Sequence, residues 1–186
     1  TADQHHASSH THLSHSSIAS DDHHAQLHAA AHRSGGADLL FDSDLLEVVV
    51  VHKSANEIIS NSAVLQNDDQ LLWAVSPNET WVFILFLEYV VTNVADLQWR
   101  FAVPTAAVMT GGGWSGRQDD NSIGETTLTD IVVWQGDANG RGARISGEVV
   151  VGANGGNVQF QWGQNIAQIS NTTVFRGSYI LAMRVG

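Results

Sequence analysis

The segment from Thr80 to Thr92, TWVFILFLEYVVT, places the strongest constraint on the fold. Its odd positions from Trp81 to Val91 are all large and apolar, and the even positions between them are also apolar except Glu88. Successive side chains of a β-strand point to opposite faces, so both faces of this strand are apolar. The segment therefore predicts a central strand that is covered on both sides, or covered on one side by a partner chain.

The rest of the chain after residue 38 also consists of short apolar or alternating segments separated by polar turns and glycines. No amphipathic stretch of helical length occurs there, so the crossover helices that a parallel sheet needs are missing. An all-β domain, built as an antiparallel β-sandwich, is the predicted fold. The further strands are expected at residues 45–52, 70–75, 97–103, 128–134, 143–151, 157–162 and 178–185.

The N-terminal segment differs sharply in composition from this body. Nine of the ten histidines lie in residues 1–32, where Leu13, Ile18 and Leu27 are the only large apolar residues. Such a segment buries too little apolar surface to fold by itself. We therefore predict a histidine-rich stalk or anchor at residues 1–37, extended or partly helical, followed by a β-sandwich domain at residues 38–186.

Charge and composition exclude several classes of function. Eight Lys and Arg residues stand against nineteen Asp and Glu residues, and the formal net charge of −11 disfavours nucleic acid and anionic membranes as partners. The longest apolar run, residues 81–87, is far shorter than the roughly 20 residues of a membrane span. The absence of cysteine fits assembly in a reducing cytoplasm and removes thiol chemistry.

The triplet His10-Thr11-His12 is a candidate metal site. In an extended chain the two imidazoles point the same way, and three chains around a three-fold axis would supply six of them. Such a set could coordinate an axial transition metal such as iron, nickel or zinc. The alternative is a solvated histidine-rich tail that binds no metal.

A second candidate site is the stretch 111–124, interpreted as a flexible loop. Trp114, Arg117, Asp119 and Asp120 combine an aromatic ring with charges of both signs, which suits recognition of a receptor protein or sugar. A solvated loop or an intersubunit contact is the alternative interpretation. The body contains only one histidine, His52, and no G-x-S-x-G sequence, so the sequence favours no enzyme.

The residues His32-Arg33-Ser34-Gly35-Gly36-Ala37-Asp38-Leu39 resemble the histidine-rich linkers of tail-fibre and other fibrous virion proteins of tailed bacteriophages. The body is similar to the C-terminal β-sandwich of phage fibre and spike proteins. The matching pieces are residues 69–75, 96–104, 145–152, 156–165 and 177–185.

This resemblance implies a jelly-roll or tumour-necrosis-factor-like domain in a homotrimeric virion protein of the tail-fibre or head-fibre type. Its expected role is structural and adhesive, with host attachment through a surface glycan or protein. The N-terminal segment would bind other virion proteins. Placement as a capsid decoration protein remains an alternative, and a carbohydrate-binding lectin module is an alternative of another class.

Overall fold

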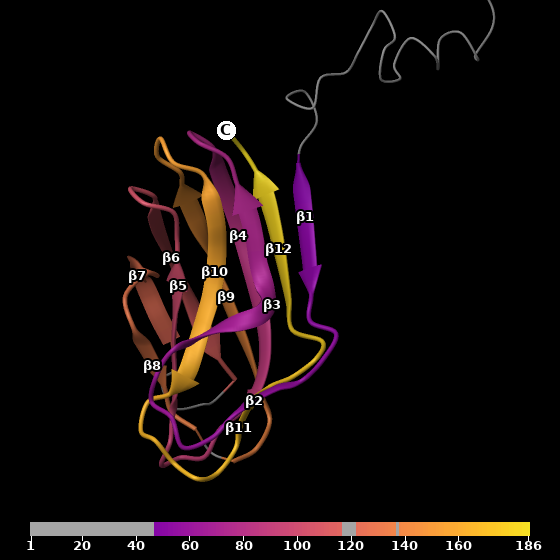
Figure 1. The fold of residues 1–186 in the computed structure, drawn as a ribbon, viewed down its shortest axis with the longest axis vertical. Coiled ribbons are helices and arrows are strands. Elements are labelled where there is room, and N and C mark those ends of the chain that lie inside the picture. The colour runs from indigo at the N-terminus through magenta and orange to yellow at the C-terminus, as the bar shows by residue number, and fades with distance from the viewer. Residues whose placement is uncertain (1–46, 117–121, 137) are drawn as a thin grey trace, which may run out of the picture. The chain divides into compact units, whose positions relative to one another are not determined.

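The structure, a computed structural model, describes residues 47–116, 122–136 and 138–186. These residues form twelve β-strands and no helix, and every strand pairing between them is antiparallel. The strands make two sheets that pack as a sandwich (Figure 1). The predicted all-β, antiparallel sandwich is confirmed.

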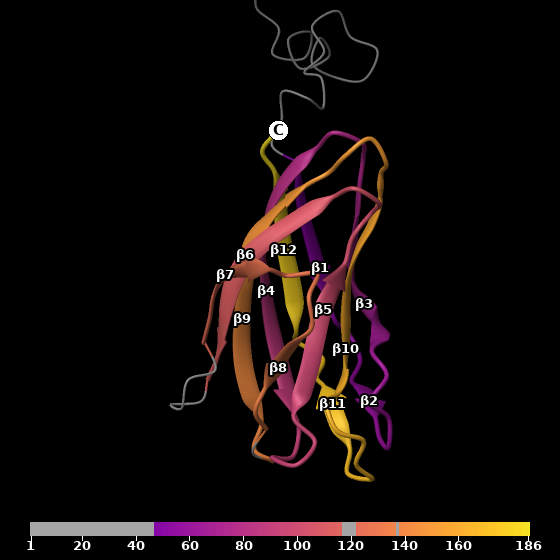
Figure 2. The same cartoon turned by 90° about the vertical axis from the view of Figure 1, so that its left-hand side faces the viewer.

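The larger sheet contains eight strands, six of which follow one another in the order β1-β12-β4-β9-β6-β7. The short strands β2 and β11 extend it at one end of the domain, where Figures 1 and 2 both show them. Its strands are β1 (Val48–His52), β2 (Glu57–Ile59), β4 (Thr80–Val90), β6 (Val108–Ser115), β7 (Ser122–Thr127), β9 (Arg141–Val150), β11 (Thr172–Val174) and β12 (Tyr179–Arg184).

The smaller sheet contains four strands in the order β3-β10-β5-β8. In Figure 1, β3 and β10 lie in front of the larger sheet. The four strands are β3 (Gln66–Val75), β5 (Leu97–Ala102), β8 (Val132–Trp134) and β10 (Gly156–Gln164).

The order of the strands is that of a jelly roll. Four antiparallel pairs, β1/β12, β3/β10, β4/β9 and β5/β8, form a ribbon in which early strands pair with late ones. Successive pairs alternate between the two sheets, so the ribbon winds around the core. The β6–β7 hairpin is inserted between β5 and β8 and continues the larger sheet beyond β9. The jelly-roll architecture that the sequence resemblance implied is therefore present.

The core lies between the sheets and is rich in aromatic rings. Strand β4 contributes one whole face to it, since its odd residues from Trp81 to Tyr89 are at most 3% exposed. The smaller sheet contributes aromatic rings that pack on each other or on the rings of β4. The centroids of these paired rings lie 4.9 to 6.4 Å apart. These rings belong to Trp73, Trp99, Phe101, Trp134 and Phe160.

One part of the sequence interpretation is wrong. Residues 111–124 are not one flexible loop, because most of them belong to the paired strands β6 and β7. The glycines permit this pairing: a Cβ atom on Gly111 would lie 2.2 Å from the carbonyl oxygen of Ser146 on β9. Strand β6 approaches β9 so closely that only glycine fits there.

Three smaller differences concern the strands. The strand expected at residues 128–134 is confined to β8 (Val132–Trp134), and residues 128–131 lie outside any strand. Strand β3 begins at Gln66, so the polar residues 67–69, which precede the strand expected at 70–75, lie inside it. The three-residue strands β2 and β11 are not predicted by the sequence pattern. The predicted boundary at residue 37, the partly helical stalk and the histidine pair lie outside the described residues. No helix in the described part of the chain has the length and apolar character needed to cross a membrane.

Candidate functional site

The outer face of the larger sheet, on the side away from the core, carries an apolar surface. On β4 it is formed by the even residues Val82, Ile84 and Phe86, which are half-buried. Their neighbours on β12, in register, are Met183, Leu181 and Tyr179. On β1 the next neighbours of Met183 and Leu181 are Val48 and Val50. We call these eight side chains the outer apolar face.

Strand β12 presents Tyr179, Leu181 and Met183 on its outward side, while Ile180 and Ala182 between them are fully buried in the core. The same separation occurs in β4, whose odd residues face the core. Both alternating sets of β4 are apolar because one fills the core and the other forms this exposed surface.

Several side chains of the outer apolar face are strongly exposed. Val50 is 67% exposed, Val48 52% and Leu181 40%. The rings of Tyr179 and Phe86 stack with centroids 5.5 Å apart, which makes a flat aromatic platform on the same surface. An extended exposed apolar patch on a protein is a mark of an interaction site.

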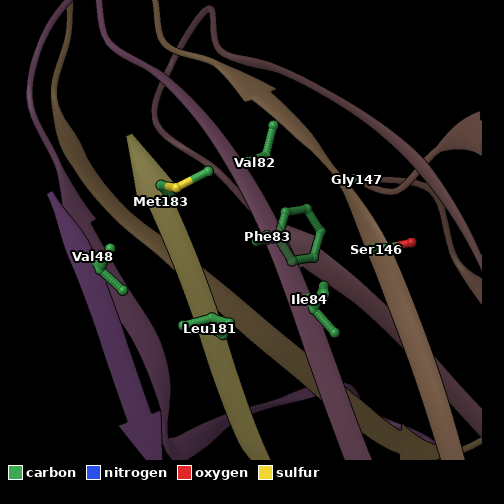
Figure 3. A pocket seen from close by; sticks show the side chains of 8 residues that line it. All are labelled: Val48, Val82, Phe83, Ile84, Ser146, Gly147, Leu181 and Met183. Carbon is green, nitrogen blue, oxygen red and sulfur yellow. The ribbon is translucent and has the colours of Figure 1, made fainter. Parts of the chain in front are cut away.

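The surface is hollowed at its centre (Figure 3). A depression of about 400 Å³ runs over β1, β12, β4 and β9, and its lining is apolar apart from the Ser146 hydroxyl and the backbone. Figure 3 shows the side chains of Leu181, Met183, Val82 and Ile84 around it. The lining residues are Val48, Val82, Phe83, Ile84, Ser146, Gly147, Leu181 and Met183.

Strand β9 forms a polar border along this face. Arg144, Ser146 and Glu148 are exposed there and lie in register with Phe86, Ile84 and Val82. An apolar centre with a polar border is the common arrangement of a protein–protein interface. The depression contains no cluster of titratable groups suited to catalysis.

Beyond this border lies Trp114, a residue that the sequence proposes for receptor binding. It is 54% exposed near the end of β6 and stands in register with Arg144. Trp114 therefore belongs to the same face of the same sheet as the outer apolar face, with one strand between them. Arg117, Asp119 and Asp120 lie outside the described residues, so their relation to Trp114 stays a prediction.

The described residues contain no group of three or more His, Cys, Asp or Glu side chains that could hold a metal ion. His10 and His12 lie outside them, and the axial iron, nickel or zinc site stays a prediction of the sequence.

Comparison with known proteins gives few matches. No family model matches the chain, and no curated protein matches it at a significant level. Among solved structures, a structure of the Gx strain of infectious bursal disease virus is similar with a TM-score of 0.23 and 9% identity, over 76% of this chain and 41% of that one. A structure of the Gt strain gives a TM-score of 0.16 and 7% identity, over 76% and 36% of the two chains.

Both neighbours are structures of a virus, and the present chain spans less than half the length of either solved chain. At these TM-scores the similarity carries no argument about function.

Proposed function

We propose that the chain is a structural subunit of a virus particle that assembles as a homotrimer through the outer apolar face. The observation that carries this proposal is the exposed, hollowed apolar surface of β1, β12 and β4. Jelly-roll domains are common in viral capsids and in lectins, and the fold alone does not choose between these classes. The apolar character of the surface favours assembly, because sugar binding needs polar groups that converge on the ligand.

A second copy of the chain is the proposed occupant of the outer apolar face. Within the same chain, residues 1–46 offer eight large apolar side chains, which are Leu13, Ile18, Leu27, Leu39, Leu40, Phe41, Leu45 and Leu46. A copy of the same domain brings an equivalent apolar surface. Burying such surface contributes about 25 cal/mol for each Å² removed from water.

Placement in a fibre or spike of a tailed bacteriophage rests on the sequence resemblance at residues 32–39. In that arrangement the histidine-rich segment would bind other virion proteins, and the sandwich would stand at the particle surface. Assignment to the tail or to the head as a decoration protein would follow from the copy number in purified particles.

Light scattering of the full chain tests the assembly. The wild-type protein should have three times the mass of one chain at micromolar concentration. Leu181→Glu should yield monomers, since it places a charge at the centre of the outer apolar face, where desolvation in the interface is costly.

Ala74→Glu is the matched control. Ala74 is exposed on β3 in the smaller sheet, so the same charge is added away from the outer apolar face. This variant should remain trimeric. A wild-type protein that is monomeric at micromolar concentration, or a Leu181→Glu variant that stays trimeric, would contradict the proposal.

Host attachment is the second candidate role, and the exposure of Trp114 supports it. Trp114→Ala separates the two roles. If Trp114 binds a receptor, particles carrying the variant should adsorb to host cells more weakly while the trimer persists. If the trimer dissociates instead, Trp114 is an intersubunit contact at the border of the outer apolar face.

A further inference from the structure

The chain contains a single lysine, Lys53, and its side chain is buried. Lys53 follows directly after β1 and is 1% exposed. Its Nζ atom lies 2.8 Å from both carboxylate oxygens of Asp68 on β3 and 2.7 Å from Oε2 of Glu57 on β2. One amine thus stands between two carboxyl groups, close to the core of the sandwich.

The equal distances to the two oxygens of Asp68 define the position of the amine. They place Nζ on the plane that bisects the carboxyl group, within hydrogen-bond distance of both oxygens. The Asp68 side chain is itself fully buried. Nucleophile and carbonyl carbon are therefore held together in a site that excludes water.

A bulge in β3 explains why Asp68 is held so firmly. Asn67 pairs with Gln161, but the next paired residues along β3 and β10 are Leu72 and Gln159, so residues 68–71 leave the ladder. Two of their backbone N–H groups bond to the Asp68 side chain instead, and that of Asp69 bonds to Glu57. The Oδ1 atom accepts hydrogen bonds from the N–H groups of Gln70 and Leu71 at 3.0 and 2.9 Å.

The two oxygens of Asp68 have different surroundings. Oδ1 is held by two backbone donors, an arrangement that stabilises negative charge developing on a carbonyl oxygen. Apart from its contact with Lys53, Oδ2 accepts one hydrogen bond, from the Trp162 Nε1 atom at 3.1 Å. Oδ1 is accordingly the oxygen to be retained in a reaction at the carboxyl carbon, and Oδ2 is the oxygen to leave.

Glu57 is placed to carry protons. Its Oε2 atom contacts Nζ of Lys53 and accepts the backbone N–H of Asp69 at 3.0 Å, while Oε1 accepts a hydrogen bond from Gln66. Burial, aided by the charge of Asp68, raises the pKa of Glu57 above its ordinary value of 4.5 despite the opposing effect of Lys53. A carboxyl group whose pKa is raised in this way is a better general base and acid near neutral pH.

We propose that Lys53 and Asp68 form an intramolecular isopeptide bond, with Glu57 as the proton carrier. The reaction joins Nζ of Lys53 to Cγ of Asp68 and breaks the bond between Cγ and Oδ2. A proton first passes from the ammonium group to Asp68, which leaves a neutral amine facing a neutral carboxylic acid. The amine then attacks Cγ, and the negative charge that develops on Oδ1 is stabilised by the N–H groups of Gln70 and Leu71.

The atoms and protons of this reaction balance without an external reagent. The ammonium group begins with three protons, and the product amide keeps one. The other two leave with Oδ2 as a water molecule, the second of them carried from Nζ by Glu57. The new amide is satisfied, because its carbonyl oxygen accepts the two backbone bonds and its N–H donates to Oε2 of Glu57. The Trp162 Nε1 atom loses Oδ2 as its acceptor in the same step.

The position of the bond suits a protein tethered by its N-terminal end. It joins the end of β1 in the larger sheet to β3 in the smaller one. Among the described strands, β1 is an edge strand that is hydrogen-bonded to β12 alone, and it is the first of them after the histidine-rich segment. A force applied through that segment would pull on β1, and the covalent bond would stop its removal at residue 53.

Intact-mass spectrometry of the denatured full chain tests the bond. The wild-type protein should be lighter than its sequence by the mass of one water molecule. A peptide digest should contain a branched peptide in which Lys53 is joined to Asp68. The variants Lys53→Met and Asp68→Ala should have their full sequence masses.

Two further variants test the role of Glu57. Glu57→Gln should abolish or greatly slow the loss of water, because the amide cannot carry the proton. Asp69→Ala is the matched control, since it removes the neighbouring exposed carboxylate and should leave the bond intact. Wild-type protein that is folded by circular dichroism and has its full sequence mass would refute the bond. Complete water loss in Glu57→Gln would refute the role of Glu57.

Discussion

Trp134 of β8 packs on Trp99 of β5, with the ring centroids 4.9 Å apart and the ring planes inclined by 54°. Trp134 also stacks on Tyr89 of the opposite sheet, with a centroid distance of 6.3 Å. Strand β8 has only three residues and lies at the edge of the smaller sheet, where β5 is its sole partner. The Trp134 ring therefore ties this short edge strand to both sheets.

Replacing this ring should destabilise the domain strongly. Trp134→Ala removes a fully buried aromatic side chain and should lower the free energy of unfolding by about 3–5 kcal/mol. Urea denaturation followed by tryptophan fluorescence measures the change. Val133→Ala, at an exposed position of the same strand, should cost less than about 1 kcal/mol. Equal losses in the two variants would contradict the anchoring role of Trp134.

Glu79 predicts a dependence of stability on pH. Burial of its carboxyl group favours the neutral form, but hydrogen bonds from Ser76 N–H, Trp81 Nε1 and Arg184 outweigh this effect and hold the pKa of Glu79 below 4.5. The contacts are 2.6, 3.0 and 3.1 Å long. Because the folded state binds the proton less well than the unfolded state, Glu79 stabilises the fold above pH 4.5 and loses this effect as the pH falls through its folded pKa.

Glu79→Gln should therefore lower the free energy of unfolding by about 1 kcal/mol at pH 7. The difference from the wild type should shrink as the pH is lowered below 4.5. Thermal unfolding across this pH range provides the measurement. A difference that stays constant or grows on acidification would contradict the assigned direction of the pKa shift.

The sequence predicts the buried strands of the fold well. The segments expected at 80–92, 97–103 and 157–162 correspond to β4, β5 and β10. Each contains several large apolar residues with a period of two, and this periodicity persists because one face of each strand fills the core. The pairing of early with late strands is not encoded in such local patterns; the resemblance to fibre and spike domains, rather than periodicity, suggested the jelly roll.

The hairpin of β6 and β7 shows where local patterns fail. Its glycines weaken any strand signal, since glycine has no side chain to pack and is common in loops. They are required by the backbone of β9, which lies too close for a Cβ atom at Gly111 or Gly113. This requirement comes from a neighbour far along the chain, and the sequence near residue 111 contains no trace of it.

The sequence also predicts the functional surfaces only in part. The double apolar pattern of β4 predicted coverage by a partner chain as one of two alternatives, and the structure leaves its even residues on the outer side of the sandwich. The cluster of Lys53, Glu57 and Asp68 was missed, because it depends on the bulge in β3. The sequence contains one indication of this cluster, since its only lysine follows directly after a strongly apolar strand.

Because β6 and β9 lie so close together, replacing a glycine by alanine should destabilise the protein at Gly147 but not at Gly140. A Cβ atom at Gly147 would lie 2.2 Å from the carbonyl oxygen of Thr110, so Gly147→Ala should push the strands apart and cost about 1–3 kcal/mol. Gly140→Ala is the control, because no atom lies within 4 Å of the new Cβ atom there. Differential scanning calorimetry of both variants makes the comparison. Equal melting temperatures in the two variants would contradict the packing argument.

The last prediction concerns the metal expected from the sequence. If three chains assemble, His10 and His12 of each chain would supply six imidazoles around one axis, and the purified trimer should contain about one iron, nickel or zinc ion per three chains. Metal binding should weaken on acidification, because only neutral imidazole is a ligand. Elemental analysis of the wild type and of a His10→Ala/His12→Ala double variant provides the measurement, with His5→Ala/His6→Ala as the control because adjacent residues of an extended chain point in opposite directions. A trimer without metal, or one whose metal content is the same in the His10→Ala/His12→Ala variant, would leave these histidines as a solvated segment.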